Sequence, residues 1–458
     1  MFSVHRGGAK AASSTVSSTA LESPQPPAPV LQPIEPLQLP KQYPLKEVQT
    51  VHQILIDKIT DNRVSTNREK LQVAARAIIN ELRLQYTSQE SDELAVQVVD
   101  EVVGHGPIEP LIREDRITDI LINGPEEIFC EVDGINRRMP YVFRDGEHLK
   151  HHIDRIVSAV GRRVDESSPI VNARLADGSR FNAILSPVSL KGAAVSIRKF
   201  GTHKIRAKEL LEKQSLAPFM LEFLDAAVKA RLNIVISGGT GAGKTTLLNT
   251  IALSIPPSER IITIEDSAEL QISLDNVVPL ETRPSNLEGE GEITQRDLVV
   301  NALRMKPDRI IIGECRRGEA FDMIQAMTTG HDGSLTTVHA SSPREALSRL
   351  QNMVLMSDMG LTEKAINQQL ASAIELIVQV ARMSDGSRRI TAISEVTGIQ
   401  DNIILMQGIF VFQQKVVELN GRVHGVFEGA GVVPDCLKRI ALSGKKFEPN
   451  FFLQKMEV

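Results

Sequence analysis

The stretch NIVISGGTGAGKTTLLNTIAL, residues 233–253, decides the fold of the larger part of the chain. An apolar run leads into several glycines and then into an amphipathic run, which predicts a strand, a tight loop and a helix in that order. In this context the loop matches the pattern G-x-x-x-x-G-K-[ST]. The stretch therefore predicts a P-loop, in which backbone N–H groups and the start of a helix bind phosphate.

Each residue of the predicted loop has an expected task in binding a nucleotide. Lys244 would reach the β- and γ-phosphates, and the Thr245 hydroxyl would bind Mg²⁺. The chain has no Asn-Lys-x-Asp guanine signature, which favours ATP over GTP. The predicted nucleotide-binding residues are Gly238, Gly239, Thr240, Gly241, Ala242, Gly243, Lys244, Thr245 and Thr246.

A P-loop requires acidic partners, and two apolar runs end in acids. DRIIIGE ends at Glu314, which we expect to meet the Mg²⁺ shell or the attacking water. RIITIEDSAEL contains Glu265, for which we expect a similar role, followed by Asp266 and Glu269. The sequence does not decide whether Glu265 or Glu314 activates water. For Asp266 and Glu269, a solvated position at a strand end is an equally good interpretation.

The rest of the chain falls into regions of different pattern. After residue 215, apolar strands alternate with helical stretches, which predicts an α/β fold with a mostly parallel sheet, and a hairpin is predicted at residues 385–386. The other predicted regions, in chain order, are a disordered proline-rich tail at 1–45, a helical bundle at 46–103, a smaller α/β domain at 104–200 and a charged linker at 201–214, before the nucleotide-binding domain at 215–458.

Composition limits the functional classes. Net charge is −5 with acids and bases intermixed, which argues against direct binding of nucleic acid by a basic face. Cys130, Cys315 and Cys436 are odd in number and widely separated, so a disulfide framework or a CxxC zinc site is not expected and a reducing cytoplasm fits. The apolar run at 402–412 is too short to span a bilayer. Any membrane contact is therefore predicted to be peripheral.

Several motifs together resemble the secretion-motor ATPase superfamily of type II and type IV secretion and type IV pili, and most nearly its CpaF/TadA-type members from tight-adherence (Tad) pili. The matching segments are GHGPIEPLI at 104–112, ITDILINGP at 117–125, VGRRVDESSPIVNARLADGSRFNA at 160–183, SIRKF at 196–200, the run from Glu281 to Glu314, and TTGHDGSLTTVHA at 328–340. One departure is CRRGEA at 315–320, where the family usually has a small or branched residue before Arg-Gly. The four-cysteine zinc element of related branches is absent.

The resemblance implies a RecA-like ATPase domain preceded by a PAS-like domain and a helical bundle. It also implies a homohexamer on inner-membrane pilus platform proteins, acting on the pilin fibre indirectly, with ATP and Mg²⁺. His331 and His339 would sense the nucleotide, since imidazole titrates near neutral pH. Arg180 and Arg198 would supply positive charge to the γ-phosphate, Arg198 from a neighbouring subunit. Alternatives are a type IV secretion ATPase that moves protein or DNA, and a P-loop DNA motor.

Overall fold

The computed structural model describes residues 37–61, 67–201, 205–285, 290–357, 359–418 and 421–458. Residues 1–36 of the predicted tail lie outside the described residues, but its last part packs against the protein. The Gln42 side-chain amide donates to the Val142 carbonyl oxygen over 2.9 Å, and Tyr43 is buried. The predicted tail was therefore too long, because the ring of Tyr43 is buried in the core of the helical bundle.

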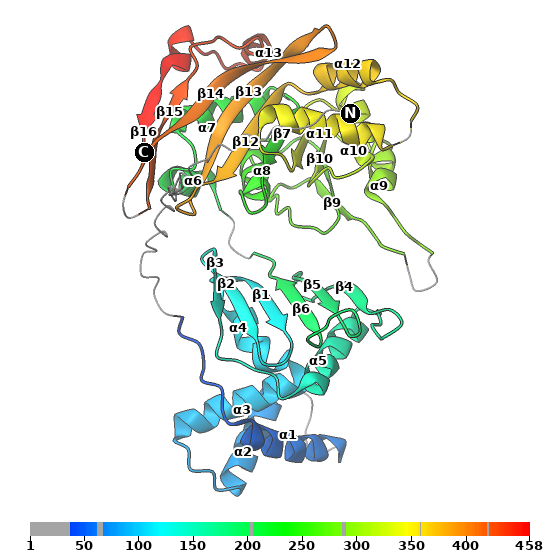
Figure 1. Ribbon diagram of the computed structural model, residues 1–458, viewed down its shortest axis with the longest axis vertical. Helices are drawn as coiled ribbons and strands as arrows, with labels where there is room; N and C mark the ends of the chain where they lie inside the picture. Colours follow the sequence, from blue (N-terminus) through cyan, green and yellow to red (C-terminus); the bar gives the residue numbers. More distant parts are fainter. Residues whose placement is uncertain (1–36, 62–66, 202–204, 286–289, 358, 419–420) are drawn as a thin grey trace, which may run out of the picture.

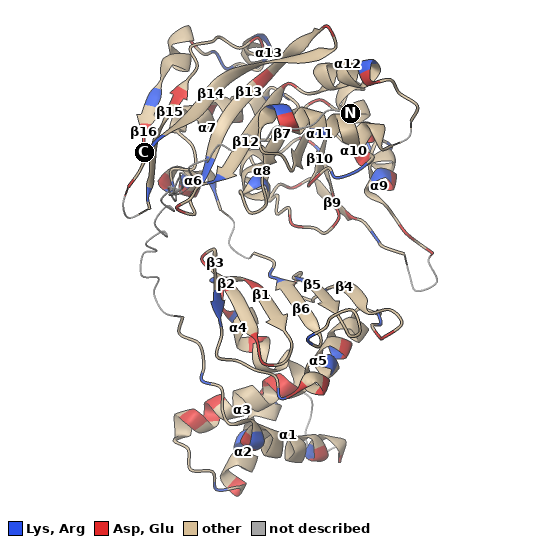
Figure 2. Ribbon diagram, viewed as in Figure 1, with Lys and Arg blue, Asp and Glu red and all other residues tan. Residues whose placement is uncertain are grey.

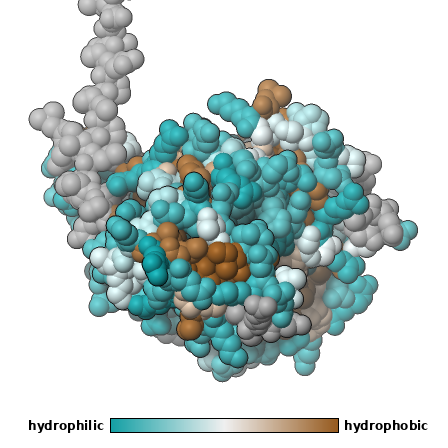
Figure 3. All heavy atoms as spheres, turned by 90° about the horizontal axis from the view of Figure 1, so that it is seen from below, coloured by the Kyte–Doolittle hydropathy of each residue, from teal (hydrophilic) through white to brown (hydrophobic). Residues whose placement is uncertain are grey.

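Three helices occupy the segment with helical periodicity: α1 (Leu45–Thr60), α2 (Arg68–Glu81) and α3 (Ser88–Val103). Asn67 caps the start of α2, and Thr87 forms a capping box with Glu90 at the start of α3. Their buried apolar faces meet in one core, at the lower end of the molecule in Figure 1. Seen from that end, the surface is mainly hydrophilic around a few exposed apolar groups (Figure 3).

The next region is a six-stranded antiparallel sheet in the order β3-β2-β1-β6-β5-β4. Strands β3 and β4 were not predicted, because neither is a continuous apolar run. The elements are η1 (Gly106–Ile108), α4 (Glu109–Arg113), β1 (Ile117–Asn123), β2 (Ile128–Val132), β3 (Ile135–Arg138), α5 (Gly146–Ala159), β4 (Ile170–Arg174), β5 (Arg180–Ile184) and β6 (Ala194–Arg198).

A buried cluster of polar side chains joins α3 to α5. His148 Nε2 lies 2.9 Å and His152 Nε2 lies 3.1 Å from the same carboxylate oxygen of Glu101. The Nδ1 atoms of both imidazoles face donors, the Arg144 backbone N–H and the Arg155 guanidinium. With each Nδ1 facing a donor, the tautomer that fits has the proton on Nε2, where it can be donated to Glu101, and the two Nε2 atoms lie 3.0 Å apart. Although the three atoms are close enough together for a cation, this proton arrangement leaves no free nitrogen lone pair to bind one.

The largest unit is a ten-stranded sheet in the order β16-β15-β14-β13-β12-β7-β11-β10-β8-β9. The six strands from β12 to β9 are parallel, as the alternation of apolar strands and helices predicts. Its first elements are α6 (Ala207–Glu212), α7 (Pro218–Lys229), β7 (Ile234–Gly238), α8 (Lys244–Ala252), β8 (Ile261–Glu265), β9 (Val277–Glu281), α9 (Gln295–Ala302), β10 (Arg309–Ile312), α10 (Glu319–Thr328), β11 (Leu335–Val338), α11 (Pro343–Leu355) and α12 (Glu363–Ala373).

The strands from β12 to β16 on the other side of this sheet pair antiparallel. The prediction of a mostly parallel sheet is therefore correct only for the nucleotide-binding side. Short connections join the successive strands from β12 to β15, and short connections allow only antiparallel pairing. A longer connection with a helix leads to β16, which also pairs antiparallel. The hairpin predicted at 385–386 joins β12 to β13. The remaining elements are β12 (Leu376–Arg382), β13 (Arg388–Gln400), β14 (Ile403–Val417), β15 (Val423–Gly429), α13 (Leu437–Leu442), η2 (Pro449–Leu453) and β16 (Lys455–Glu457).

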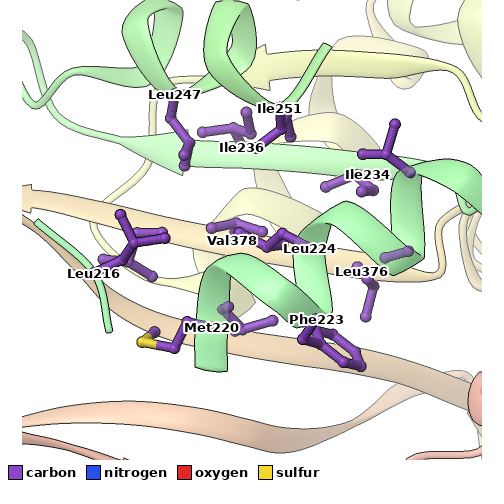
Figure 4. Close-up of a cluster of buried hydrophobic side chains, with 14 of the residues drawn as sticks. Leu216, Met220, Phe223, Leu224, Ile234, Ile236, Leu247, Ile251, Leu376 and Val378 are labelled. Carbon is purple, nitrogen blue, oxygen red and sulfur yellow. The ribbon is translucent and has the colours of Figure 1, made fainter. Parts of the chain in front are cut away.

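Helices cover both faces of the sheet and fix the strand ends in space. On one face, side chains of α7 such as Phe223 and Leu224 pack against β7 and β12 (Figure 4). The predicted linker contains α6, whose Leu210 is buried in the same core; residues 202–204 lie outside the described residues. The described residues include no helix that is long and apolar enough to cross a bilayer.

Candidate functional site

The loop between β7 and α8 has the backbone of a phosphate cradle. Gly241 and Gly243 have φ values of 68° and 95°, a region that L side chains rarely adopt. A Cβ at Gly238 would lie 2.5 Å from the Val380 carbonyl oxygen, so only glycine fits between the loop and β12. The predicted strand, loop and helix are all present, and the N-terminus of α8 faces the loop. A phosphate group in this loop would accept hydrogen bonds from successive backbone N–H groups.

Lys244 is held over the loop by groups of its own site. Its Nζ donates to the Gly239 carbonyl oxygen over 3.1 Å, and both ring nitrogens of His339 lie 3.3–3.4 Å from it. The side chain is buried, and burial lowers the pKa of Lys244 below its usual range. A phosphate would restore the favourable partner that a buried ammonium requires. Lys244 is therefore placed as the sequence predicts.

Glu265 ends β8 in a buried position, only 4% exposed. Its carboxylate accepts hydrogen bonds from the backbone N–H groups of Glu269 and Leu270, at 2.9 and 3.0 Å. Gly313 makes space for it, because a Cβ there would lie 2.8 Å from Glu265 Cγ. Burial raises the pKa of Glu265 to about 7, and the neighbouring Glu269 carboxylate adds to the effect. A carboxylate with this pKa can accept a proton near neutral pH, as a general base must.

Glu314 lies beyond the end of β10, between a histidine and an arginine. His339 Nε2 lies 2.7 Å from Glu314 Oε1, and Arg316 donates to Glu314 Oε2. Arg316 also pairs with Asp266 over 3.2 Å. Burial and the nearby ammonium of Lys244 lower the pKa of His339, which keeps the imidazole neutral. This network brings Glu314, His339 and Lys244 together, as the sequence predicts for all three.

Arg180 and Arg198 come from the six-stranded sheet and line the same cavity as the P-loop. Arg180 donates to the Ser267 carbonyl oxygen over 3.0 Å and pairs with Glu269 over 2.9 Å, while Arg198 pairs with Asp119. Both arginines therefore reach the P-loop of their own chain. Within the single chain, β5 and β6 face the loop, and the expectation that Arg198 serves a neighbouring subunit stays a prediction.

Two adjoining cavities lie between the two sheets. The cavity over the P-loop measures about 340 Å³, and its neighbour along α8 measures about 1150 Å³. The residues that line both cavities are Arg180, Arg198, Thr245, Thr246 and Glu269. The shared lining makes the two cavities continuous around the start of α8, with room for a phosphate chain in one and a larger group in the other.

His331 is not brought to this site, so the prediction that it binds nucleotide was wrong. It precedes β11, whereas His339 follows β11, and the four residues of a strand separate the two ends by roughly 13 Å. The turn after His331 contacts the start of β7 instead, where Asn233 accepts a hydrogen bond from the Gly333 N–H over 2.8 Å. Proximity in sequence was misleading because β11 runs from one edge of the sheet to the opposite edge. The residues before β11 and the residues after it therefore lie at different edges.

Sequence reasoning missed two arginines of the site. Arg316 follows Glu314 directly, so its position beside the acids was a usable signal. Arg388 donates from Nε to the Gly241 carbonyl oxygen over 2.8 Å, although 147 residues separate the two, and no local pattern could reveal this. The arginines of the 281–304 segment, Arg283, Arg296 and Arg304, do not line the cavity over the P-loop.

The donor set fits Mg²⁺ bound with a nucleotide. Glu314 Oε1 is buried and has only His339 Nε2 close to it among the described residues, at 2.7 Å, so one of its two lone pairs remains available for a metal ion. The Thr245 hydroxyl group lies at the start of α8 and lines the same cavity. Oxygen ligands of this kind are those that Mg²⁺ prefers. Thr245 and Glu314 would hold the ion, which when bound supplies positive charge to the β- and γ-phosphate oxygens.

Comparisons with known proteins show the family of the chain. A model of the family described as type II/IV secretion system protein matches residues 101–416. A putative conjugal transfer protein of Mycobacterium tuberculosis is 36% identical over 300 residues, which cover 64% of this chain and 85% of that protein. The type IV secretion system protein VirB11 of Brucella suis is 32% identical over 328 residues, with coverages of 65% and 91%. The crystal structure of a Brucella suis VirB11 ATPase in complex with sulphate covers 63% of this chain and 94% of its own, at 30% identity and a TM-score of 0.35.

Proposed function

Because the chain belongs to the type II/IV secretion system protein family and is one of its ATPases, we propose that it is the motor of a Tad pilus. In this proposal it works as a cytoplasmic homohexamer, docked peripherally on inner-membrane platform proteins, and moves the pilin fibre indirectly. The RecA-like and PAS-like assignments are part of the same proposal. The parallel strands beside the P-loop support the first, and the six-stranded antiparallel sheet supports the second.

The observation that carries a motor function is that two separate sheets supply one nucleotide cavity. The P-loop contributes Lys244, and the six-stranded sheet contributes Arg180 and Arg198. A triphosphate between them would attract the two arginines, which now pair with Glu269 and Asp119. Loss of the γ-phosphate would remove that attraction, so each cycle would move one sheet relative to the other. Movement of this kind can perform work on a platform.

Within the cycle, each residue has a task that its surroundings support. Glu265 would accept a proton from the attacking water, since its raised pKa suits a general base. Lys244 would hold the β- and γ-phosphates, and Glu314 with Thr245 would hold Mg²⁺. His339 lies within 3.4 Å of Lys244 and 2.7 Å of Glu314, so it would detect the γ-phosphate through both.

A type IV secretion ATPase that moves protein or DNA is the second candidate. Similar proteins favour it, since they include conjugal transfer proteins and the type IV secretion system protein VirB11. The Tad assignment depends instead on the motif resemblance along residues 104–314. Because both candidates share the nucleotide site, biochemistry on the purified ATPase would not distinguish them.

Deletion of the gene, followed by rescue with wild type or Lys244→Ala, tests the proposal. Surface fibres would be counted by electron microscopy, and DNA transfer to recipient cells would be scored in the same strains. The Tad proposal predicts that fibres disappear, that wild type restores them and that Lys244→Ala does not. Normal fibres in the deletion strain, together with lost transfer of DNA or secreted protein, would establish the second candidate instead.

A further inference from the structure

The end of the β12–β13 hairpin carries two arginines side by side. Arg382 and Arg388 pair directly across the two strands. Like charges opposite each other destabilise a hairpin, so each side chain must gain something elsewhere. Figure 1 shows this end of β12 pointing toward the six-stranded sheet, and Figure 2 shows positive charge there. The side chains of Arg382 and Arg388 contact different parts of the protein.

Arg388 contacts the outer side of the P-loop. Its Nε donates to the Gly241 carbonyl oxygen over 2.8 Å, and its Cδ lies 3.2 Å from where a Cβ of Gly243 would be. The guanidinium makes no other hydrogen bond to the part of the chain that the structure describes, and the side chain lines the cavity over the loop. Arg382 instead donates to the Gly134 carbonyl oxygen over 3.0 Å, in the turn between β2 and β3. Only one of the two arginines therefore contacts the phosphate cradle.

The Arg388 contact acts on a peptide group that the nucleotide would also use. The Gly241 carbonyl and the Ala242 N–H belong to the same peptide. This N–H donates to the Gly239 carbonyl oxygen over 3.3 Å, and a phosphate in the cradle would compete for it. A donor on the carbonyl side polarises the peptide and strengthens the N–H on the other side. It also fixes a loop whose two glycines at positive φ would otherwise move freely.

We propose that Arg388 is a positioning residue of the ATP site, which braces the P-loop through the Gly241 carbonyl and thereby sharpens its hold on phosphate. The brace depends on a donor at the Nε position, more than on the positive charge. The proposal rests on ATP hydrolysis alone and does not depend on which machine the motor drives.

Three substitutions separate the donor from the charge. Arg388→Gln places an amide nitrogen the same number of bonds from Cα as Nε, so it keeps the donor and loses the charge. Arg388→Lys places a methylene group there, so it keeps the charge but loses the donor at that position and moves it one bond farther out. Arg388→Ala removes both. Arg382→Gln is the matched control, because it makes the same charge change on the same hairpin without touching the P-loop.

The measurements are KM and kcat for ATP, together with the Kd of a fluorescent ATP analogue on the full chain. Arg388→Ala and Arg388→Lys should each weaken binding and raise KM by roughly tenfold to a hundredfold, the loss expected for one charged hydrogen bond. Arg388→Gln should stay within about threefold of wild type, as should Arg382→Gln. Lys244→Ala serves as the inactive reference.

Two outcomes would overturn the proposal. If Arg388→Lys retains affinity and Arg388→Gln loses it, Arg388 acts through its charge and not through the brace. If all three variants bind like wild type, the contact has no part in nucleotide binding. Thermal unfolding without nucleotide controls for a misfolded variant, and the comparison between lysine and glutamine remains decisive even if alanine destabilises the hairpin.

Discussion

Glu265 and Glu101 are both buried glutamates that accept hydrogen bonds, yet their protonation is opposite. Burial raises the pKa of Glu265 to about 7, and the nearby Glu269 carboxylate raises it further. The hydrogen bonds from two peptide N–H groups lower this pKa, but not enough to offset the increase. Burial also opposes ionisation of Glu101, but the hydrogen bonds from His148 and His152 outweigh it and hold its pKa at about 2.

The difference separates a reactive group from a structural one. A carboxylate with a pKa near 7 gains from accepting a proton, so Glu265 is suited to chemistry. A carboxylate with a pKa near 2 remains charged across the physiological range and stabilises the fold through its partners. The contrast predicts that changes around Glu265 alter turnover, whereas changes around Glu101 alter stability.

The largest effect is expected on the catalytic side, from Lys244→Ala. Removing the ammonium leaves the β- and γ-phosphates without their main cation, so ATP hydrolysis should fall below detection. The unfolding midpoint without nucleotide should change little, because the ammonium's hydrogen-bond partners among the described residues are the Gly239 carbonyl oxygen and His339. Phosphate release assays and thermal unfolding would check the two halves of the prediction. Near-normal turnover would show that this loop is not the ATP site.

Glu265→Gln tests the reactive carboxylate directly. Loss of the general base should lower kcat by ~10²–10⁴-fold, with ATP binding preserved. The wild-type rate should also fall as pH drops through about 7, because the carboxyl is then protonated and cannot accept a proton from water. The residual rate of the variant should lack that inflection. A pH profile of kcat/KM from pH 5.5 to 8.5 measures this, and an unchanged inflection in the variant would assign it to another group.

Acid stability tests the structural carboxylate. The folded pKa of Glu101 is below its ordinary value of 4.5, so its stabilisation is present above pH 4.5 and is lost as pH falls toward 2. The full loss is about 3 kcal/mol for a group of this burial. Glu101→Gln should be less stable than wild type at pH 7 and should lose less on acidification. Urea unfolding at pH 7, 5 and 3.5 would show this, while ATP turnover at pH 7 should stay within about threefold of wild type.

Local sequence pattern was enough for the elements that form from neighbouring residues. The strand, loop and helix around Lys244 follow from apolar periodicity and glycines, and the strands ending at Glu265 and Glu314 are continuous apolar runs. Parallel strands meet at their carboxyl ends, so both acids could be expected beside the loop. The α/β class was therefore predictable, as was this part of the site.

Contacts between distant segments could not be predicted in this way. Arg388 reaches Gly241 only because the β12–β13 hairpin, whose turn the sequence does predict, lies beside β7, and the pairing of β12 with β7 has no local signature. The position of Arg198 over its own P-loop depends on how the two sheets pack. Apart from the predicted β12–β13 hairpin, the antiparallel side of the large sheet was missed, because the sequence of a long strand does not reveal which other strands pair with it.

The smallest expected effect comes from His331, and it tests the correction to its predicted role. His331 and His339 stand at opposite ends of β11, and only His339 lies near Lys244 and Glu314. His339→Ala should lower kcat by roughly tenfold, because it removes a hydrogen-bonding group from the γ-phosphate end of the site. His331→Ala should leave kcat and KM within about twofold of wild type. Its Nδ1 is buried without a partner among the described residues, so truncation removes an unsatisfied group and should not lower stability much.

Steady-state kinetics of the two alanine variants, prepared in parallel, make the comparison. Equal losses in both would mean that β11 transmits a contact at one end to the other, and the separation between the nucleotide edge and the opposite edge of the sheet would then be wrong.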